Sequence, residues 1–232
     1  GYKSIDKFAG GLTRGEITIV GGRPGHGKTT FLLNLLSSML DRGYKVLLFN
    51  RELPNTEVIK KLICLESGEL SYGMIRKAVF SKSELEKLKE AKKKVVKKFN
   101  PERFLMFDNL KSFSKSSSEV KKFKPDVIFD DYIQLISPAD IKVDRRFQLE
   151  RLCNEYKWLA KESNASVVLA SQLNRQLEYR GSKVRPQLSD LAESGAIEQV
   201  AENVFFTYYD YKINPLKGLG KDKLQIVASK VR

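Results

Sequence analysis

The stretch from residue 16 to residue 30, EITIVGGRPGHGKTT, decides the fold of this chain. It starts as an apolar run typical of a buried strand, continues as a glycine-rich loop, and ends in a helical pattern. The spacing Gly22-x-x-x-x-Gly27-Lys28-Thr29 matches the P-loop pattern in the strand–loop–helix context that the pattern requires. Backbone N–H groups of such a loop surround a phosphate, the lysine reaches the β- and γ-oxygens, and the threonine hydroxyl binds Mg²⁺. We therefore expect a site for ATP or another nucleoside triphosphate with Mg²⁺, lined by Gly22, Arg23, Pro24, Gly25, His26, Gly27, Lys28, Thr29 and Thr30.

His26 is the only histidine and occupies a variable position of the loop. A histidine can act as a base near neutral pH, but here we interpret it as a spacer with some phosphate contact. Hydrolysis therefore needs carboxylates from elsewhere in the chain.

Apolar, β-rich runs alternate with helical patterns along the whole chain, which is typical of a parallel sheet wound with helices. Several runs are continuously apolar, as expected for strands that are covered on both faces. We predict an α/β fold with a mostly parallel, twisted sheet and helices on both faces. The expected strands are 16–21, 45–50, 103–108, 126–131, 166–171, 203–209 and 223–229.

Three segments have helical spacing. Residues 29–43 form the first, with Gly43 as its stop signal, and residues 144–164 form the second. In the second, Phe147, Leu149, Leu152, Tyr156 and Leu159 fall roughly on one face. The third, residues 81–99, is rich in lysine, but its apolar residues recur every three or four positions after a capping pattern at Ser81/Glu84 or Ser83/Glu86. The solvated face of an amphipathic helix explains its lysines better than a nucleic-acid tail. Residues 113–119, 137–144 and 174–190 are expected to be loops.

Composition and charge narrow the class of protein. The 232 residues are 41% hydrophobic, which is enough for one substantial core, and the formal net charge of +14 favours a polyanionic partner such as nucleic acid. The alternative is a soluble basic protein that binds no nucleic acid, since the same charge fits both. Cys64 and Cys153 are far apart, so neither a disulfide framework nor a zinc site is expected. No apolar run reaches the ~18 residues of a membrane span, so we expect a soluble protein. Because the chain begins at Gly1 and stops on a strand-like run, we expect a domain of a longer chain.

Polar residues follow three of the expected strands at the edge where ligands of open α/β folds bind. Asp130 and Asp131 end one strand, and since adjacent residues point to opposite faces, one of them should face a metal ion. Glu52 follows another strand and is suited to orient and deprotonate an attacking water. Gln172 ends a third strand with a neutral amide suited to contact the γ-phosphate. We expect Glu52, Gln172 and one of the two aspartates to lie near the bound phosphates.

Six segments together resemble the DnaB-like hexameric replicative helicases of bacteria and phages, specifically their C-terminal RecA-like ATPase domain. The segments are GGLTRGEITIVGGRPGHGKTTF, NRELP, DDYIQL, LASQLNRQLEYR, RPQLSDLAESGAIEQVAEN and ASKVR. The resemblance covers almost the whole chain, which implies one domain over residues 1–232 with residues 1–14 as a lead-in. The P-loop segment is shared with recombinases and clock-type ATPases, whereas SQLNR followed by SDLAESGAIEQ is much more specific to the helicases.

The resemblance implies a role for each matching residue. It implies that Lys28 and Thr29 bind phosphate and Mg²⁺, that Glu52 is the catalytic base, that Asp131 rather than Asp130 is the Walker-B carboxylate, and that Gln172 senses the γ-phosphate. It also implies a central channel where the loop after Gln172 and the DLAESGAIEQ segment hold single-stranded DNA. The basic loop residues fit contacts to phosphates without base reading. Ordinary loop solvation is the alternative. The expected DNA-binding residues are Arg175, Arg180, Lys183, Arg185, Glu193, Ser194 and Gly195.

The chain also departs from the family pattern. Ala192 stands where helicases of this family often have arginine, and Asp130 replaces the usual apolar residue. The helical N-terminal domain that docks primase in bacterial members is absent from the chain. Contacts with primase or a loader would therefore use regions outside it.

The last strand ends in SKVR, where Lys230 and Arg232 lie two residues apart and so on one face. For a single subunit these would be edge-strand charges that discourage aggregation. The resemblance implies instead that both reach the γ-phosphate bound by the neighbouring subunit, with Arg232 as an arginine finger.

We therefore expect a replicative helicase motor that couples ATP hydrolysis to translocation on single-stranded DNA and duplex unwinding as a ring, in the cytoplasm of a bacterium or of a phage host. The alternatives are a recombinase-type filament ATPase and a nucleotide-gated DNA clamp or loader. A recombinase would form open filaments, and a clamp would bind nucleotide without turnover.

Overall fold

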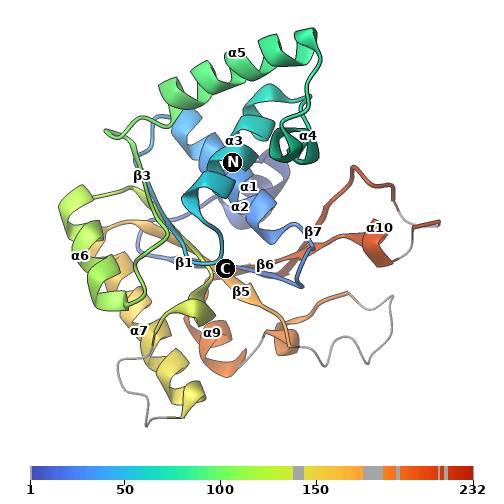
Figure 1. The fold of residues 1–232 in the computed structure, drawn as a ribbon. Coiled ribbons are helices and arrows are strands. Elements are labelled where there is room, and N and C mark those ends of the chain that lie inside the picture. The colour runs from blue at the N-terminus through green and yellow to red at the C-terminus, as the bar shows by residue number, and fades with distance from the viewer. Residues whose placement is uncertain are drawn as a thin grey trace.

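The computed structural model describes residues 2–137, 144–174, 185–191, 194–213, 215–216 and 219–231. Its centre is a sheet with the strand order β3-β2-β4-β5-β1-β6-β7 (Figure 1). All neighbouring strands are parallel except the edge pair β6 and β7, which is antiparallel. All seven predicted strands are thus confirmed, and so is the mostly parallel sheet. Their bounds are β1 Ile17–Gly22, β2 Val46–Asn50, β3 Phe104–Phe107, β4 Val127–Asp131, β5 Ser166–Gln172, β6 Asn203–Tyr208 and β7 Gln225–Lys230.

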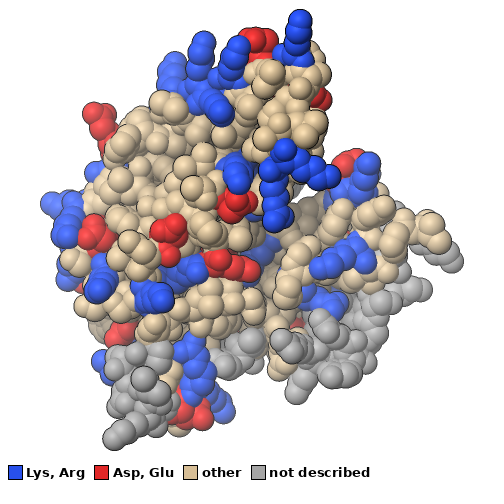
Figure 2. Space-filling view, viewed as in Figure 1, with Lys and Arg blue, Asp and Glu red and all other residues tan. Residues whose placement is uncertain are grey.

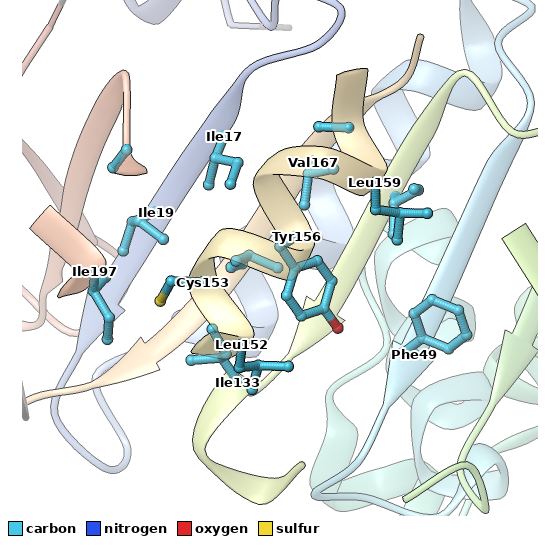
Figure 3. Close-up of a cluster of buried hydrophobic side chains, with 14 of the residues drawn as sticks. Ile17, Ile19, Phe49, Ile133, Leu152, Cys153, Tyr156, Leu159, Val167 and Ile197 are labelled. Atoms are coloured by element: carbon cyan, nitrogen blue, oxygen red, sulfur yellow. The ribbon is translucent and has the colours of Figure 1, made fainter. Parts of the chain in front are cut away.

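Helices cover both faces of the sheet and bury one apolar cluster on each. On one face, α2 (Lys28–Asp41), α3 (Asn55–Ser67) and α5 (Lys82–Lys98) pack over a cluster that includes Leu36 and Phe129. On the other, α6 (Phe113–Phe123), α7 (Arg145–Ser163) and α9 (Ser194–Val200) cover a cluster that includes Tyr156 (Figure 3). The central strands are buried on both sides, which explains their continuous apolar runs. Short elements complete the description: α1 Lys3–Ala9, α4 Tyr72–Lys77, η1 Ile133–Leu135, η2 Leu188–Asp190 and α10 Asp210–Ile213.

The lysine-rich segment is the amphipathic helix α5, as predicted. The Ser81 hydroxyl accepts a hydrogen bond from the Glu84 backbone, and the Glu84 carboxylate accepts one from the Ser81 backbone, so the first of the two capping patterns is the one used. Ala91 and Val95 are buried in the cluster that α2 and α3 also cover, and α5 packs mainly on α3. The lysines Lys89, Lys93 and Lys97 point to solvent.

Two expectations about the second half of the chain were wrong. Residues 113–119 were expected to be a loop but begin α6, because Ser112 caps its N-terminus and Val120 and Phe123 bury an apolar face. Phe147 was placed on the buried face of α7, but it is 63% exposed in the first turn of that helix. The other four apolar residues predicted for that face are buried as expected.

The carboxyl ends of the parallel strands meet at one edge of the sheet. In the register of the ladders, Gly22 pairs with Gln172, and Asn50 pairs with Asp131. The loop after β1, the turn after β2 and the last residues of β4 and β5 are therefore neighbours. None of the helices in the described ranges combines the length and apolar character needed to cross a bilayer.

Candidate nucleotide site at the carboxyl edge of the sheet

The P-loop connects β1 to the N-terminus of α2. Gly25 and Gly27 adopt φ angles of +73° and +78°, which only glycine takes readily. Gly27 is the N-cap residue of α2, so the free N–H groups of the first helical turn face the loop. A built-in Cβ at Gly27 would also lie 3.1 Å from the Leu224 side chain. The loop is therefore shaped to hold an anion at a helix N-terminus.

Asp131 faces the P-loop from β4. Its Oδ2 accepts a 2.6 Å hydrogen bond from the Thr29 hydroxyl, and its Oδ1 lies 3.9 Å from Lys28 Nζ. Burial raises the pKa of the Asp131 carboxyl, and Lys28 and Thr29 oppose this effect by favouring the charged form. Asp131 Oδ1 is buried and, among the described residues, has no hydrogen-bond partner. It is an oxygen ligand that the protein alone leaves unsatisfied.

Asp130 points to the opposite face of β4, into the other apolar cluster. Both of its oxygens accept hydrogen bonds from the Arg51 guanidinium, at 2.6 Å each, and Tyr156 also donates to it. The geometry thus separates the two adjacent carboxylates, with Asp131 on the side of the P-loop as the resemblance implied. The alternation of strand side chains is the physical reason.

A pocket of about 280 Å³ joins the predicted catalytic residues to the P-loop. Glu52 after β2 and Gln172 at the end of β5 both line it, as does Lys61 of α3. Sequence reasoning missed Lys61, whose Nζ lies 4.3 Å from the centre of the Tyr72 ring. Its position nearly two turns into α3, the helix that follows Glu52, was the available signal. The remaining lining residues are Arg23, Pro24, Gly25, Gly27, Lys28, Thr29 and Thr30.

A second, more apolar pocket of about 700 Å³ lies beside the first, and Thr30 lines both. Its walls come from α1, the first turns of α2, strand β6 and the edge strand β7 with the residue before it. They include Tyr2, Phe31, Asn34, Leu224 and Ile226. The lead-in expected at the N-terminus therefore contains a helix that forms one wall of a pocket.

The His26 side chain is only 3% exposed and contacts the chain at the end of β6. Its Nδ1 accepts a 3.2 Å hydrogen bond from the Tyr209 backbone N–H, and its ring lies 6.1 Å from the Tyr208 ring. Burial lowers its pKa to about 4, and the positive charges of Arg23 and Lys212 act in the same direction. His26 is therefore neutral at pH 7, and its ring packs against the chain at the end of β6. Its predicted contact with phosphate stays a prediction.

Lys212 of α10 is a further contact that sequence reasoning did not find. Its Nζ donates a 2.8 Å hydrogen bond to the Pro24 carbonyl. A Cβ added to Gly25 would lie 2.5 Å from the same nitrogen. The segment after β6 thus adds a positive charge to the outside of the P-loop.

The predicted DNA-binding residues are only partly covered by the structure. Arg175, Arg180, Lys183 and Glu193 lie outside the described residues. Arg185 is exposed, and Ser194 and Gly195 begin the short helix α9. In Figure 1, α9 lies on the face of the sheet opposite α5. In Figure 2, lysine and arginine side chains also gather along the outer edge formed by α5.

Lys230 ends β7 and donates a 2.8 Å hydrogen bond to the Glu198 carbonyl of α9. In the single chain its ammonium group is therefore occupied at the end of a helix, where a positive charge is favourable. Arg232 lies outside the described residues. The contact of these two residues with a neighbouring subunit remains a prediction.

The donor set beside the P-loop fits a magnesium ion. Thr29 and Asp131 offer a hydroxyl and a carboxylate with an unsatisfied oxygen, which are hard ligands of the kind that Mg²⁺ prefers. Within the described ranges, no group of three His, Cys, Asp or Glu side chains could hold a metal by itself. Phosphate oxygens of a nucleotide would have to complete such a site, as is usual for Mg²⁺.

Comparisons with known proteins agree with this geometry. The sequence model of the family described as "DnaB-like helicase C terminal domain" matches residues 1–232. The chain is 31% identical over 229 residues to a "Probable plasmid replicative DNA helicase" of Chlamydia psittaci, covering 95% of this chain and 49% of that protein. It is 33% identical over 222 residues to "Replicative DNA helicase DnaB" of Haemophilus influenzae, covering 92% and 46%. The chain thus spans about half the length of these curated relatives.

Two solved structures have the same fold. One is described as "The Structure Of A DnaB-Like Replicative Helicase And Its Interactions With Primase", with a TM-score of 0.90 and 29% identity over all of this chain and 56% of that one. The other, described as an "ATPase Domain", has a TM-score of 0.89 and 29% identity over all of this chain and 82% of that one. The sheet and its helices are therefore those of the RecA-like ATPase domain of these proteins.

Proposed function

The chain belongs to the family of DnaB-like helicase C-terminal domains, and from this premise we propose that it is an ATP-hydrolysing motor that moves on single-stranded DNA and unwinds duplex DNA. One observation carries the proposal. Lys28, Asp131, Glu52 and Gln172 come from four different parts of the chain and meet around the P-loop. A phosphate site, a metal ligand, a candidate base and a γ-phosphate contact are the parts that hydrolysis requires.

Each of these residues has a separate task in the proposed reaction. Lys28 and the first N–H groups of α2 bind the β- and γ-phosphates. Thr29 and Asp131 would hold Mg²⁺, which when bound would supply positive charge beside the phosphate oxygens. Glu52 orients the attacking water and accepts its proton. Gln172 contacts the γ-phosphate and so distinguishes ATP from ADP.

The whole nucleotide has room in the neighbouring pockets. The polar pocket of about 280 Å³ suits the phosphates, and the apolar pocket of about 700 Å³ suits the base and ribose. Because Thr30 lines both, a nucleotide bound by the P-loop can reach from one to the other. This arrangement favours ATP or another nucleoside triphosphate over inorganic phosphate as the ligand.

We also propose that the active unit is a ring of identical subunits, by the family resemblance a hexamer. In that ring Lys230 and Arg232 would act on the nucleotide of the neighbouring subunit, and Lys230 would exchange its Glu198 contact for the phosphate. The loop that contains Arg175, Arg180, Lys183 and Arg185, together with Glu193, Ser194 and Gly195, would hold the DNA backbone in the channel. The proposed ring would act in the cytoplasm. Any contact with a primase or a loader would use regions outside this chain.

Electron microscopy and an unwinding assay with a forked DNA substrate test the proposal together. We expect closed rings in the presence of nucleotide, and ATP-dependent strand separation. Open filaments that exchange strands would favour the recombinase alternative. Nucleotide binding without any turnover would favour the clamp or loader alternative.

A further inference from the structure

A buried ion pair joins the ends of β2 and β4 directly behind the nucleotide pocket. The Arg51 Nε and Nη2 atoms each lie 2.6 Å from one oxygen of Asp130. The side chains of Arg51 and Asp130 are only 4% and 0% exposed. A two-pronged arginine–carboxylate contact of this kind fixes the relative orientation of both groups as well as their distance.

The surroundings determine the position of this pair from several sides. Arg51 also donates to the Leu110 carbonyl and to the Ser116 hydroxyl at 3.0 Å, while the Tyr156 hydroxyl donates to Asp130. Figure 3 shows Tyr156 among the apolar side chains, with its hydroxyl oxygen at the end directed away from the helix backbone. Burial disfavours the charge on Arg51, but Asp130 outweighs this effect and raises the pKa of the guanidinium, so Arg51 remains charged.

Each member of the pair is the sequence neighbour of a residue with a task in the proposed reaction. Arg51 precedes Glu52, and Asp130 precedes Asp131. The Arg51 backbone N–H also donates a 2.8 Å hydrogen bond to the Asp131 carbonyl. The two strand ends are thus connected twice, once through the backbone and once through the buried side chains.

Glu52 follows this connection directly in the chain. It is exposed and makes no hydrogen bond or ion pair with a described residue, so no side-chain partner orients its carboxylate. Its backbone position is set by the residue before it. Stability alone is a weak reason for the pair, because two buried charges lose hydration that their attraction only partly restores.

We propose that the Arg51–Asp130 pair is a positioning device that holds Glu52 at the correct place relative to Asp131 and the phosphate pocket. Arg51 and Asp130 are positioning residues and do not touch the nucleotide. The inference rests on the proposed function, since it assigns a purpose to the pair only if Glu52 handles the attacking water. It predicts that loss of the pair slows the chemical step and spares nucleotide binding.

The test is the double variant Arg51→Met/Asp130→Leu, which removes both charges and keeps apolar volume in a buried site. Paired replacement of this type usually preserves folding, whereas a single change leaves one charge buried alone. We expect kcat for DNA-stimulated ATP hydrolysis to fall between about 10-fold and 100-fold. The affinity for a fluorescent ATP analogue with Mg²⁺, measured at equilibrium, should stay within about threefold, and thermal unfolding should remain cooperative.

A double-mutant cycle with Glu52→Gln separates positioning from a purely structural role. If the pair acts through Glu52, adding Glu52→Gln to the double variant should cost much less than Glu52→Gln costs in the wild-type chain. Full additivity of the two losses would overturn the inference, and so would an unchanged kcat in the folded double variant. A wild-type chain that hydrolyses no ATP would overturn the proposed function and this inference with it. An active wild-type chain beside an equally active double variant overturns the inference alone.

Discussion

The Thr29 hydroxyl donates a 2.6 Å hydrogen bond to Asp131, although 102 residues separate them in the sequence. The bond joins the first turn of α2 to the end of β4. It places a hydroxyl and a carboxylate beside Lys28, at the N-terminus of a helix.

Asp131→Asn tests the metal ligand. The amide keeps the shape of the side chain but removes the charge that would hold Mg²⁺, so we expect kcat for ATP hydrolysis to fall roughly 100-fold. Raising the Mg²⁺ concentration should recover part of the loss. Asp41→Asn, at the exposed far end of the same helix α2, is the matched control and should hydrolyse ATP like the wild-type chain. Equal activity of the Asp131 and Asp41 variants would contradict the assignment.

Paired charge removal tests the DNA-binding loop. We expect Arg180→Ala/Lys183→Ala to weaken binding to single-stranded DNA and to make the slope of log K against log salt shallower by about 1.4, since each neutralised phosphate adds about 0.7. The control Lys93→Ala/Lys97→Ala removes the same charge from α5, on the face of the sheet opposite α9. Its slope should stay unchanged. Fluorescence anisotropy at several salt concentrations measures both, and equal slopes in the two variants would move the DNA site elsewhere.

Mixed rings test whether one chain completes the site of its neighbour. Arg232→Ala should bind nucleotide and form rings but lose most hydrolysis, and Lys28→Ala should be inactive for a different reason. Mixing the two variants should restore part of the activity, because some interfaces then combine an intact P-loop with an intact Arg232. Lys223→Ala, an exposed lysine just before β7, should behave like the wild-type chain. Absence of recovery in mixed rings would leave SKVR as a solubilising strand end.

The pH dependence of stability tests the buried state of His26. Its pKa is lowered from 6.5 to about 4 by burial and by Arg23 and Lys212, so between these values the unfolded chain binds a proton that the folded chain does not. The contribution of His26 to stability is therefore complete above pH 6.5 and is lost as the pH falls towards 4. His26→Asn keeps a hydrogen-bond acceptor for Tyr209 but does not titrate. We expect the wild-type chain to lose about 2 kcal/mol relative to this variant between pH 7 and pH 5 in urea unfolding. Parallel pH profiles would show that His26 is not buried as a neutral ring.

The strands and the phosphate loop could be predicted from sequence because both are local patterns. The apolar run Val46–Asn50 predicts a strand, and the spacing from Gly22 to Thr29 predicts a P-loop. Neither prediction needs knowledge of the rest of the chain. The strand alternation also predicted that Asp130 and Asp131 would face opposite sides, but only the fold shows which side holds the P-loop.

Residues that act through distant contacts were not predictable in the same way. Lys61 lines the phosphate pocket and Lys212 contacts the phosphate loop only in the folded chain, and neither belongs to a local motif. Arg51 forms its pair with Asp130 across 79 positions, so its importance depends on strand order. The prediction of a loop at residues 113–119 was wrong for a related reason. Burial of Val120 and Phe123 outweighs the weak helix preference of the serines in this segment.

The proposed motor function is best tested by the rate of ATP hydrolysis with and without single-stranded DNA. This rate is compared between the wild-type chain and Lys28→Ala. Lys60→Ala is the control, because Lys60 is paired with Glu57 on α3 and does not line the phosphate pocket. We expect DNA to accelerate hydrolysis by the wild-type chain and by Lys60→Ala, and we expect Lys28→Ala to be at least about 100-fold slower in both conditions. DNA-stimulated hydrolysis that persists in Lys28→Ala would contradict the assignment of the P-loop as the hydrolytic site.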